Sequence, residues 1–406
     1  MRIIVINDHG SISGGADQVA IASLNTLACE GYDVTFVSSV GPIDKHIDQN
    51  RVRVINFGFH DLISNPSRLN AAIHGLWDFR CAKQLGKVLD DYDPSDTIIH
   101  LHTWCKSLTS SVVREIQSRN FKLVCTLHDY FSVCPNGGLY DYRKMQNCSL
   151  KPMSIACAMT HCDSRSYSQK LWRFVRQIIQ KQVGGIPKNI AYFISVSDYS
   201  EALIRPYLSA QSKIFRIRNP ININLSTPAT PEKNLAFCFV GRLAPEKGGA
   251  VFAAAALKAG VPAIFIGKGS EEHAIKLANP LAELLGWQDR AGVNNAIRSS
   301  RALVFPSLWH ETQGLTVAEA TAIGIPVIVS DKCAASEEII DGETGLLFRV
   351  GDINDLADKI RLLHDDPELA KQMGKKAYEM YWSKPSTIKN HVTNLIACYQ
   401  EIIQTA

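Results

Sequence analysis

Short apolar runs rich in β-branched residues alternate with stretches of helical periodicity along nearly the whole chain. Several runs are almost wholly apolar, which is typical of strands buried on both faces of a parallel sheet. The predicted strands are 2–6, 34–38, 52–57, 97–102, 122–128, 192–197, 213–218, 235–240, 262–266, 302–306, 327–330 and 345–348. The predicted helices between and after them include 16–30, 71–89, 356–364 and 387–404. This alternation predicts an α/β fold with doubly wound parallel sheets.

A break in the pattern predicts two domains. Residues 219–234 are rich in Asn, Pro, Ser and Thr and show little periodicity, so we interpret them as a linker. A chain of 406 residues also exceeds the usual size of a single core. We expect a first domain at 1–220 and a second at 221–384. The final helix, in 385–406, is expected to pack back on the first domain.

The composition narrows the class of protein. With 46% hydrophobic and 20% charged residues the chain has ample core material, and a net charge of +4 is too small for a nucleic-acid-binding surface. The first residues run directly into a predicted strand, and no apolar run approaches the roughly 20 residues of a membrane span. Eleven cysteines, an odd number, favour reduced thiols. We therefore expect a cytoplasmic enzyme.

Two glutamates eight residues apart mark the most informative segment, 306–326. Glu311 lies in a polar turn after a predicted strand, and Gly314 begins a short helix that carries Glu319. A strand, a polar turn and a helix N-terminus form an anion site in α/β proteins, because the first helical N–H groups lack partners. The carboxylates suggest a ligand that has hydroxyls as well as phosphates. A structural interpretation is also open: Thr316 and Glu319 fit a capping box, and Glu311 could be a solvated turn residue.

Glycine loops follow the first predicted strand of each domain. Gly14 and Gly15 precede a helix, although the dinucleotide fingerprint G-x-G-x-x-G is absent and a lone glycine pair is more often a plain turn. In the second domain, Arg242 and Lys247 lie in a loop that begins at Gly241, just past the end of a strand. Open α/β sheets bind ligands at this edge, and the two cations suit a diphosphate.

Motifs from both domains occur in a characteristic order. After the glycine pair at 14–15 come segments 241–248, 267–269, 311–319, 324–328 and 341–348. Together they resemble the retaining glycosyltransferases of family 4, which have the GT-B fold of two facing Rossmann-like domains. The resemblance covers nearly the full chain and is strongest from 235 to 350.

The resemblance implies a role for each matching position. Arg242 and Lys247 would hold the donor diphosphate, Glu311 would lie at the transferred sugar and the reacting face, and Glu319 would bind the ribose hydroxyls. The other donor-binding positions would act through close backbone approach to the diphosphate, the sugar or the base. They are Gly14, Gly15, Gly241, Gly286, Trp287, Gly314, Leu315 and Thr316.

Histidines at the ends of two predicted strands are further candidates. His128 matches a family histidine that contacts the transferred sugar, although a histidine at this place can also be purely structural. His100 and His102 could line an acceptor cleft, but the structural interpretation is favoured for both.

The resemblance also implies the chemistry. The donor would be a UDP- or GDP-hexose, and the acceptor a saccharide or polyprenyl-linked saccharide, as in bacterial surface polysaccharide assembly. No catalytic metal or other cofactor is expected, because the cations would stabilise the leaving diphosphate. Asp91 and Asp93 match the D-x-D metal motif of other glycosyltransferases, but we interpret them as a helix-ending loop. Alternatives are another GT-B enzyme, of the glycogen synthase or sucrose-phosphate type, and a non-catalytic sugar-nucleotide-binding module.

Two features remain open in the sequence. Cys134, Cys148, Cys157 and Cys162 cluster within thirty residues near His161, and could be buried thiols, a local disulfide or a structural metal site. In 170–183 an apolar face opposes a basic one, which predicts either a helix packed on the first domain or peripheral contact with an anionic membrane.

Overall fold

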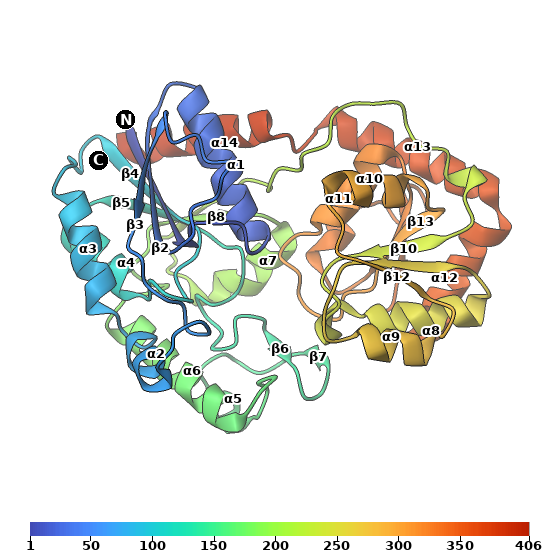
Figure 1. The fold of residues 1–406 in the computed structure, drawn as a ribbon, viewed down its shortest axis with the longest axis horizontal. Coiled ribbons are helices and arrows are strands. Elements are labelled where there is room, and N and C mark those ends of the chain that lie inside the picture. Colours follow the sequence, from blue (N-terminus) through green and yellow to red (C-terminus); the bar gives the residue numbers. More distant parts are fainter. Residues whose placement is uncertain (406) are drawn as a thin grey trace. The chain divides into compact units, whose positions relative to one another are not determined.

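The computed structural model describes residues 1–405, which form two compact units (Figure 1). Unit 1 comprises residues 1–139, 149–220 and 388–405, and unit 2 comprises 140–148 and 221–387. A short hairpin, β6 (Tyr140–Asp141) and β7 (Gln146–Asn147), groups with unit 2 although the chain on both sides of it belongs to unit 1. The first domain predicted from the sequence, 1–220, includes this hairpin, whereas the structure assigns it to unit 2.

Unit 1 is built on a seven-stranded parallel sheet with the order β3-β2-β1-β4-β5-β8-β9. The strands are β1 Arg2–His9, β2 Asp33–Val40, β3 Val52–Asn56, β4 Thr97–Leu101, β5 Lys122–Thr126, β8 Tyr192–Ser195 and β9 Lys213–Arg216. The helices are α1 Gly15–Cys29, α2 Arg68–His74, α3 Phe79–Leu89, α4 Ser111–Ser118, α5 Ile155–Met159, α6 Tyr167–Gln182, α7 Asp198–Ile204 and α14 Ile388–Gln404.

The apolar run 3–6 of β1 explains how the sheet of unit 1 is covered on both faces. Ile3 and Val5 pack in a core with residues of α1 and α14, whereas Ile4 and Ile6 pack in a second core with residues of α3 and α4. Since side chains of a strand alternate between faces, a strand between two helical layers needs apolar residues at every position. Each such buried side chain contributes roughly 2 kcal/mol of transfer free energy.

One predicted helix of unit 1 is wrong. Residues 71–89 were expected to form one helical stretch, but α2 ends at His74, with Gly75 as its C-cap, and α3 begins after Asp78. The Asp78 carboxylate accepts hydrogen bonds from the N–H groups of Arg80 and Cys81, which satisfies the start of the second helix. Two helices therefore replace one.

Unit 2 contains a six-stranded parallel sheet with the order β12-β11-β10-β13-β14-β15. The strands are β10 Phe237–Val240, β11 Ala263–Ile266, β12 Glu283–Gly286, β13 Ala302–Phe305, β14 Val327–Ser330 and β15 Gly345–Phe348. The helices are α8 Gly249–Ala259, α9 Glu272–Ala278, α10 Arg290–Arg298, α11 Leu315–Ile323, α12 Ile353–Asp365 and α13 Pro367–Ser383. Phe237 and Phe239 pack on the side of α8 and α12, and Cys238 packs on the side of α10 and α11.

Each sheet has one point where the direction of winding reverses. In unit 1 the chain moves outward from β1 to β2 and β3, then returns to β4 on the other side of β1. In unit 2 it moves from β10 to β11 and β12, then returns to β13 beside β10. Ligands of open α/β sheets bind at the carboxyl ends of the two strands that flank such a reversal. The fold thus defines one candidate crevice in each unit.

Candidate functional site

At the reversal of the sheet in unit 2, the loops after β10 and β13 are in direct contact. The loop after β10 ends in a short 3₁₀ turn, Pro245–Lys247, and continues through Gly248 into α8. Gly248 has a φ of +72°, and a Cβ there would lie 2.0 Å from the carbonyl oxygen of Pro306. The N–H of Leu308 donates to the carbonyl of Glu246 at 2.9 Å. Glycine at 248 therefore allows the loops after β10 and β13 to meet.

Lys247 and Glu311 form an ion pair across these two loops. Lys247 Nζ lies 2.6 Å from Glu311 Oε1. Glu311 is only 6% exposed and also accepts a hydrogen bond from Ser307 Oγ at 3.0 Å. The ammonium additionally lies 5.2 Å from the centroid of the Trp309 ring, within cation–π range. The two residues, 64 positions apart in the sequence, are thus held together where the sheet reverses its winding.

Arg242 is held by a different carboxylate. Its Nη2 lies 2.7 Å from Glu246 Oε1, and Glu246 is buried. The Arg242 side chain itself is 68% exposed, so its guanidinium keeps donors for a ligand. The sequence predicted no role for Glu246, although it lies in segment 241–248, and none for Ser307, because neither residue type in a loop indicates that it orients a cation or a carboxylate of the site.

The N-terminus of α11 adds unpaired backbone donors. Gly314 is the N-cap, and a Cβ there would lie 2.4 Å from Ala335 Cβ, so only glycine lets the helix begin so close to that residue. The capping-box interpretation is wrong, because Thr316 is the second residue of the helix and no side chain caps it. The first intrahelical bond is that of the Ala318 N–H to the Gly314 carbonyl, so the preceding amides, including those of Leu315 and Thr316, lack intrahelical partners.

Glu319 lies one turn into α11 and is mostly buried. Burial raises its pKa to about 7, while the charge of Arg290 acts in the opposite direction. Within residues 1–405 it has neither a hydrogen-bond nor an ion-pair partner, unlike Glu311. The two glutamates therefore differ in environment. Glu311 is held by Lys247 and Ser307, whereas the carboxyl oxygens of Glu319 remain available to accept hydrogen bonds from a ligand.

The remaining predicted positions of unit 2 lie at the carboxyl ends of β10 and β12. Gly241 follows β10 directly, and its N–H donates to the Ile266 carbonyl at 2.9 Å. Gly286 ends β12, and its carbonyl accepts from the Gly267 N–H at 2.8 Å. Trp287 follows and is largely exposed, so its ring is available for contact.

The candidate site of unit 1 includes the loop after β1. Gly14 is extended, with nothing within 4 Å of where a Cβ would lie, and Gly15 begins α1. The buried Asp17 organises this loop: it accepts from Ser13 N at 3.0 Å, from Ser13 Oγ at 2.6 Å and from Asn7 Nδ2 at 2.8 Å. Asp17 is another residue whose role sequence reasoning missed.

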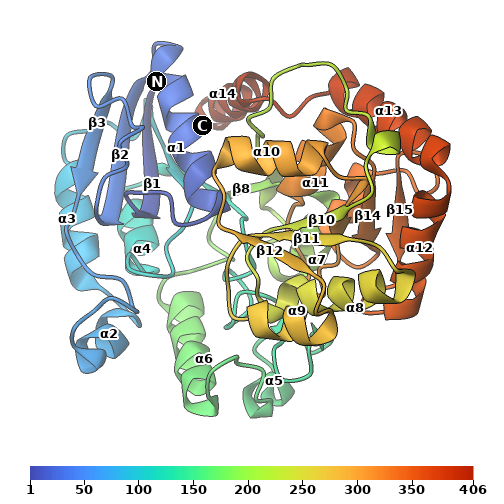
Figure 2. The same cartoon turned by 45° about the vertical axis from the view of Figure 1, so that its right-hand side comes forward.

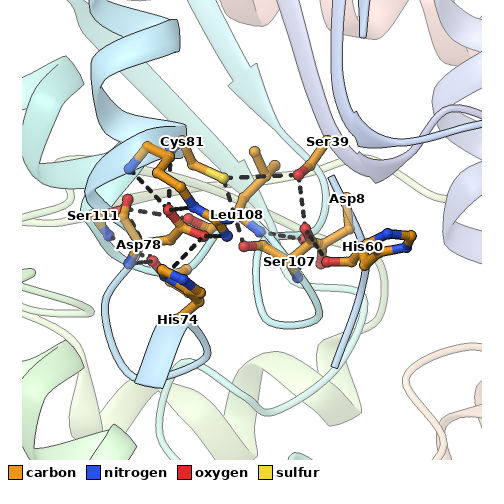
Figure 3. Close-up of polar contacts among 11 residues, drawn as sticks. Asp8, Ser39, His60, His74, Asp78, Cys81, Ser107, Leu108 and Ser111 are labelled. Carbon is orange, nitrogen blue, oxygen red and sulfur yellow. Dashed lines mark hydrogen bonds and ion pairs between the residues drawn. The ribbon is translucent and has the colours of Figure 1, made fainter. Parts of the chain in front are cut away.

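The loop after β4 is fixed beside the end of β1. Asp8 accepts hydrogen bonds from the N–H groups of Lys106, Ser107 and Leu108, each at 2.9 Å. Figure 3 shows Asp8 facing Ser107, with Ser39 and the carbonyl of His60 also hydrogen-bonded to the Ser107 hydroxyl. A buried carboxylate that accepts three backbone donors is a rigid anchor. It keeps both strands that flank the reversal in register.

Three histidines lie near the carboxyl ends of the neighbouring strands β4 and β5. His100 is buried, with Nδ1 at 2.6 Å from the Tyr399 hydroxyl and Nε2 at 2.6 Å from Thr126 Oγ1, which agrees with a structural role. His102 Nδ1 lies 2.9 Å from His128 Nε2. Burial lowers the pKa of His128 to about 4 and those of the other two well below the usual value, so all three rings are neutral near pH 7.

The aspartates of the D-x-D sequence do not converge. Asp91 pairs with Arg53 at 2.9 Å, and Asp93 accepts from the Ser95 N–H at 2.8 Å in the loop after α3. Within residues 1–405, no group of three or more His, Cys, Asp or Glu side chains is arranged to hold a metal ion.

The cysteine-rich segment contains no disulfide, and within residues 1–405 none of the eleven cysteines is joined to another through sulfur. In unit 1, Cys134, Cys157 and Cys162 are buried. Cys157 Sγ lies 3.4 Å from Nζ of the buried Lys170, and Cys162 Sγ lies 3.1 Å from Asn136 Nδ2. Of the three alternatives left open, buried thiols describe Cys134, Cys157 and Cys162.

Helix α6 does not pack in the way that its two faces suggest. Lys170 and Arg176, from the basic face, are buried, and Arg176 Nη1 donates to the Cys105 carbonyl at 3.0 Å. From the apolar face, Leu171, Val175 and Ile178 are between 41% and 46% exposed. The interpretation that the whole apolar face packs inward is therefore wrong. In the described chain, no helix is both long and apolar enough to cross a bilayer.

Several known proteins are similar to this chain in sequence or in structure. Phosphatidyl-myo-inositol mannosyltransferase from Mycobacterium leprae is 33% identical over 153 residues, which cover 36% of this chain and 41% of that protein. The putative glycosyltransferase EpsD from Bacillus subtilis is 23% identical over 333 residues, or 79% of this chain and 81% of EpsD. The structure of HepE from Anabaena in complex with UDP-glucose matches with a TM-score of 0.70 at 17% identity, covering 99% of this chain and 100% of HepE.

Two family profiles match consecutive parts of the sequence. Residues 223–380 match the profile described as Glycosyl transferases group 1, and residues 13–225, just over half of the chain, match the one described as Glycosyltransferase Family 4. The two Rossmann-like units and the structural match over nearly the full length show the GT-B fold. The chain belongs to glycosyltransferase family 4 and is a glycosyltransferase.

Proposed function

We propose that this enzyme is a retaining glycosyltransferase. It moves a hexose from a UDP- or GDP-sugar to a hydroxyl of a glycan or of a lipid-linked oligosaccharide, in the assembly of a bacterial surface polysaccharide. The ion pair between Lys247 and Glu311 carries the proposal, because it joins a cation and a carboxylate where the donor-side sheet reverses its winding. The likeness to HepE, whose structure contains UDP-glucose, supports a nucleotide sugar as donor.

The donor diphosphate is held by positive groups of unit 2. Arg242 offers a planar fork to phosphate oxygens, Lys247 offers a point charge, and the first amides of α11 offer hydrogen bonds. Glu319 accepts hydrogen bonds from the ribose hydroxyls, and Glu311 accepts from the transferred sugar. Trp287 contacts the base. In unit 1, the backbone at Gly14, just before Gly15 begins α1, leaves room for a phosphate to approach closely.

Transfer occurs on one face of the sugar without a covalent glycosyl-enzyme. Glu311 is a poor nucleophile, since it is held by Lys247 and by the Ser307 hydroxyl. The bond from the anomeric carbon to the diphosphate breaks, the bond to the acceptor oxygen forms, and the acceptor proton passes to an oxygen of the leaving diphosphate. Arg242, Lys247 and the amides of α11 stabilise the charge that develops on this leaving group. In this scheme they supply what a metal ion supplies in other enzymes.

An exposed apolar surface of unit 1 supports a lipid-linked acceptor. We call this the α6 surface: Leu171, Val175 and Ile178 of α6, Leu69 and Ile73 of α2, and Ile155 and Met159 of α5, all exposed. The three helices lie together in both views (Figure 1, Figure 2), Trp172 Nε1 bonds to the Ala72 carbonyl, and the Tyr167 hydroxyl bonds to the Ala158 carbonyl.

The charge around the α6 surface matches an anionic membrane. Of the seven lysines and arginines in residues 149–190, Lys170 and Arg176 are buried and the other five are exposed or partly exposed, while the single aspartate, Asp163, is buried. The whole chain has a net charge of only +4. Exposed apolar side chains surrounded by basic residues are the composition of a segment that lies in a lipid interface. The enzyme then acts peripherally, at the cytoplasmic face of the plasma membrane.

A thermal-shift screen with UDP-, GDP- and ADP-sugars tests the donor. A ligand at about 100 times its Kd stabilises the folded state by about 2.7 kcal/mol, so one of these sugars raises the melting temperature. If none does, the donor site is wrongly assigned. A donor that binds, but is transferred to no saccharide or lipid-linked acceptor, favours the non-catalytic binding module instead. Transfer to glucan or to a sugar phosphate favours the glycogen synthase or sucrose-phosphate type.

A further inference from the structure

His102 lies behind His128 at the carboxyl edge of the sheet in unit 1. His102 is buried in the loop directly after β4. Its backbone N–H donates to the Ile6 carbonyl at 2.9 Å, which fixes the backbone beside β1. Its ring packs on that of His100, with the centroids 4.1 Å apart, and its Nδ1 edge meets His128, whose ring centroid is 5.2 Å away. The position of its Nδ1, 2.9 Å from His128 Nε2, is therefore constrained by the backbone bond to Ile6 and by the ring of His100.

The hydrogen bond between the two rings has only two possible directions. A neutral imidazole carries one proton, so one ring donates and the other accepts. If His128 donated through Nε2, the proton of His102 would be on its own Nε2. That nitrogen is buried and has no hydrogen-bond partner within residues 1–405.

The unpartnered nitrogen decides the direction. A buried N–H without an acceptor is rarer and more costly in native proteins than an acceptor whose lone pair is not used. The proton of His102 therefore belongs on Nδ1, where it has a partner in His128 Nε2. His128, being neutral as well, must then carry its own proton on Nδ1.

We infer that His102 is a positioning residue that fixes the tautomer of His128, so that His128 meets the substrate as a hydrogen-bond donor through Nδ1 and not as a base. This rests on the proposed function for the identity of the substrate group, a hydroxyl of the transferred sugar. From its place at the end of a predicted strand, the functional role considered for His102 was to line an acceptor cleft. The role inferred here is different. It also agrees with proton transfer to the leaving diphosphate, which requires no basic side chain.

Nitrogen NMR of the full-length protein labelled with ¹⁵N-histidine tests the inference. Long-range proton–nitrogen correlations distinguish a protonated ring nitrogen from a bare one, and the signals that disappear in His128→Gln identify His128. The expected result is a protonated Nδ1 and a bare Nε2 on His128. His102→Asn keeps an N–H donor near the place of Nδ1 and preserves this pattern, whereas His102→Leu removes the donor and shifts His128 toward the other tautomer.

Kinetics separate positioning from folding. His102→Leu lowers kcat about tenfold, as for one lost hydrogen bond, with little change in KM for the donor, and His102→Asn restores most of kcat. Protonation of His128 on Nε2 in the unmodified protein would overturn the inference, as would an Asn variant whose spectrum equals that of the Leu variant. The spectra are independent of turnover. The expected spectra without any transfer activity therefore support the tautomer and count against the proposed function alone.

Discussion

The Lys247 ammonium and the Glu311 carboxylate, 2.6 Å apart, connect the loops that follow the two central strands of unit 2. Since Glu311 is buried, removal of the cation leaves a carboxylate without its counter-charge. We predict that Lys247→Met lowers the free energy of unfolding by about 2 kcal/mol and that adding Glu311→Gln recovers part of the loss. A double-mutant cycle in urea should give a coupling of about 1–3 kcal/mol. Additive effects would show that the pair is not formed in solution.

Gly248 is predicted to be essential for the contact between the same two loops. An alanine there combines a φ of +72° with a Cβ 2.0 Å from the Pro306 carbonyl oxygen. Gly260 has nearly the same φ, +73°, but nothing within 4 Å, and it provides a matched control. We expect Gly260→Ala to cost about 1 kcal/mol of unfolding free energy and Gly248→Ala about 3 kcal/mol or more. Equal costs, measured by chemical denaturation, would mean that the loops do not meet.

Glu319 is predicted to make stability depend on pH. Its pKa rises from the ordinary 4.5 to about 7 in the folded protein, so the folded state binds this proton more tightly than the unfolded chain does. Stability from this group is therefore lost as the pH rises from about 4.5 through about 7. Glu319→Gln should stabilise the protein by about 2 kcal/mol at pH 8 and by nearly nothing at pH 4. A gain that is the same at both pH values would contradict the burial of this carboxyl group.

The α6 surface is predicted to bind anionic vesicles. Replacing Leu171, Val175 and Ile178 together by serine should weaken binding to phosphatidylglycerol-containing vesicles more than tenfold, because three apolar side chains no longer enter the interface. Binding of the unmodified protein should also weaken with salt and be slight for pure phosphatidylcholine. Leu277 and Leu281 of unit 2 are highly exposed apolar residues outside this surface, so their double serine variant is the control. Binding is measured by co-sedimentation of the protein with vesicles. If both variants co-sediment to the same extent, the α6 surface is not the membrane contact.

The strands were the best-predicted part of the fold. The bounds of β14 and β15 agree with the predicted 327–330 and 345–348, because a strand buried between helices is an apolar run that ends where the polar loop begins. The edge strand β12, Glu283–Gly286, was not predicted. Only one of its faces is partly buried, so its sequence does not form an apolar run. For α6, periodicity showed two faces correctly but could not show which one packs inward. Buried Lys170 and Arg176 find sulfur, carbonyl and aromatic partners that lie far away in the sequence.

The site was predictable only in its parts. Glycines, cations and carboxylates after strand ends marked the loops, because these residue types have few other reasons to follow a buried strand. The pairing of Lys247 with Glu311 and of Arg242 with Glu246, and the link from His102 to His128, depend on strand order and on loop packing. Local patterns in a single sequence give neither the strand order nor the packing of the loops.

The affinity of the Arg242→Ala variant for its nucleotide sugar tests the donor site most directly. The control is Arg349→Ala, an arginine of the same unit that is 73% exposed, against 68% for Arg242, and is likewise paired with carboxylates. With the sugar nucleotide that gives the largest thermal shift, calorimetry should show that Arg242→Ala raises Kd about tenfold or more, as for a lost charge-assisted bond to phosphate, while Arg349→Ala leaves it unchanged. An unchanged Kd for Arg242→Ala, or an equal loss in both variants, would contradict the assignment of the donor site.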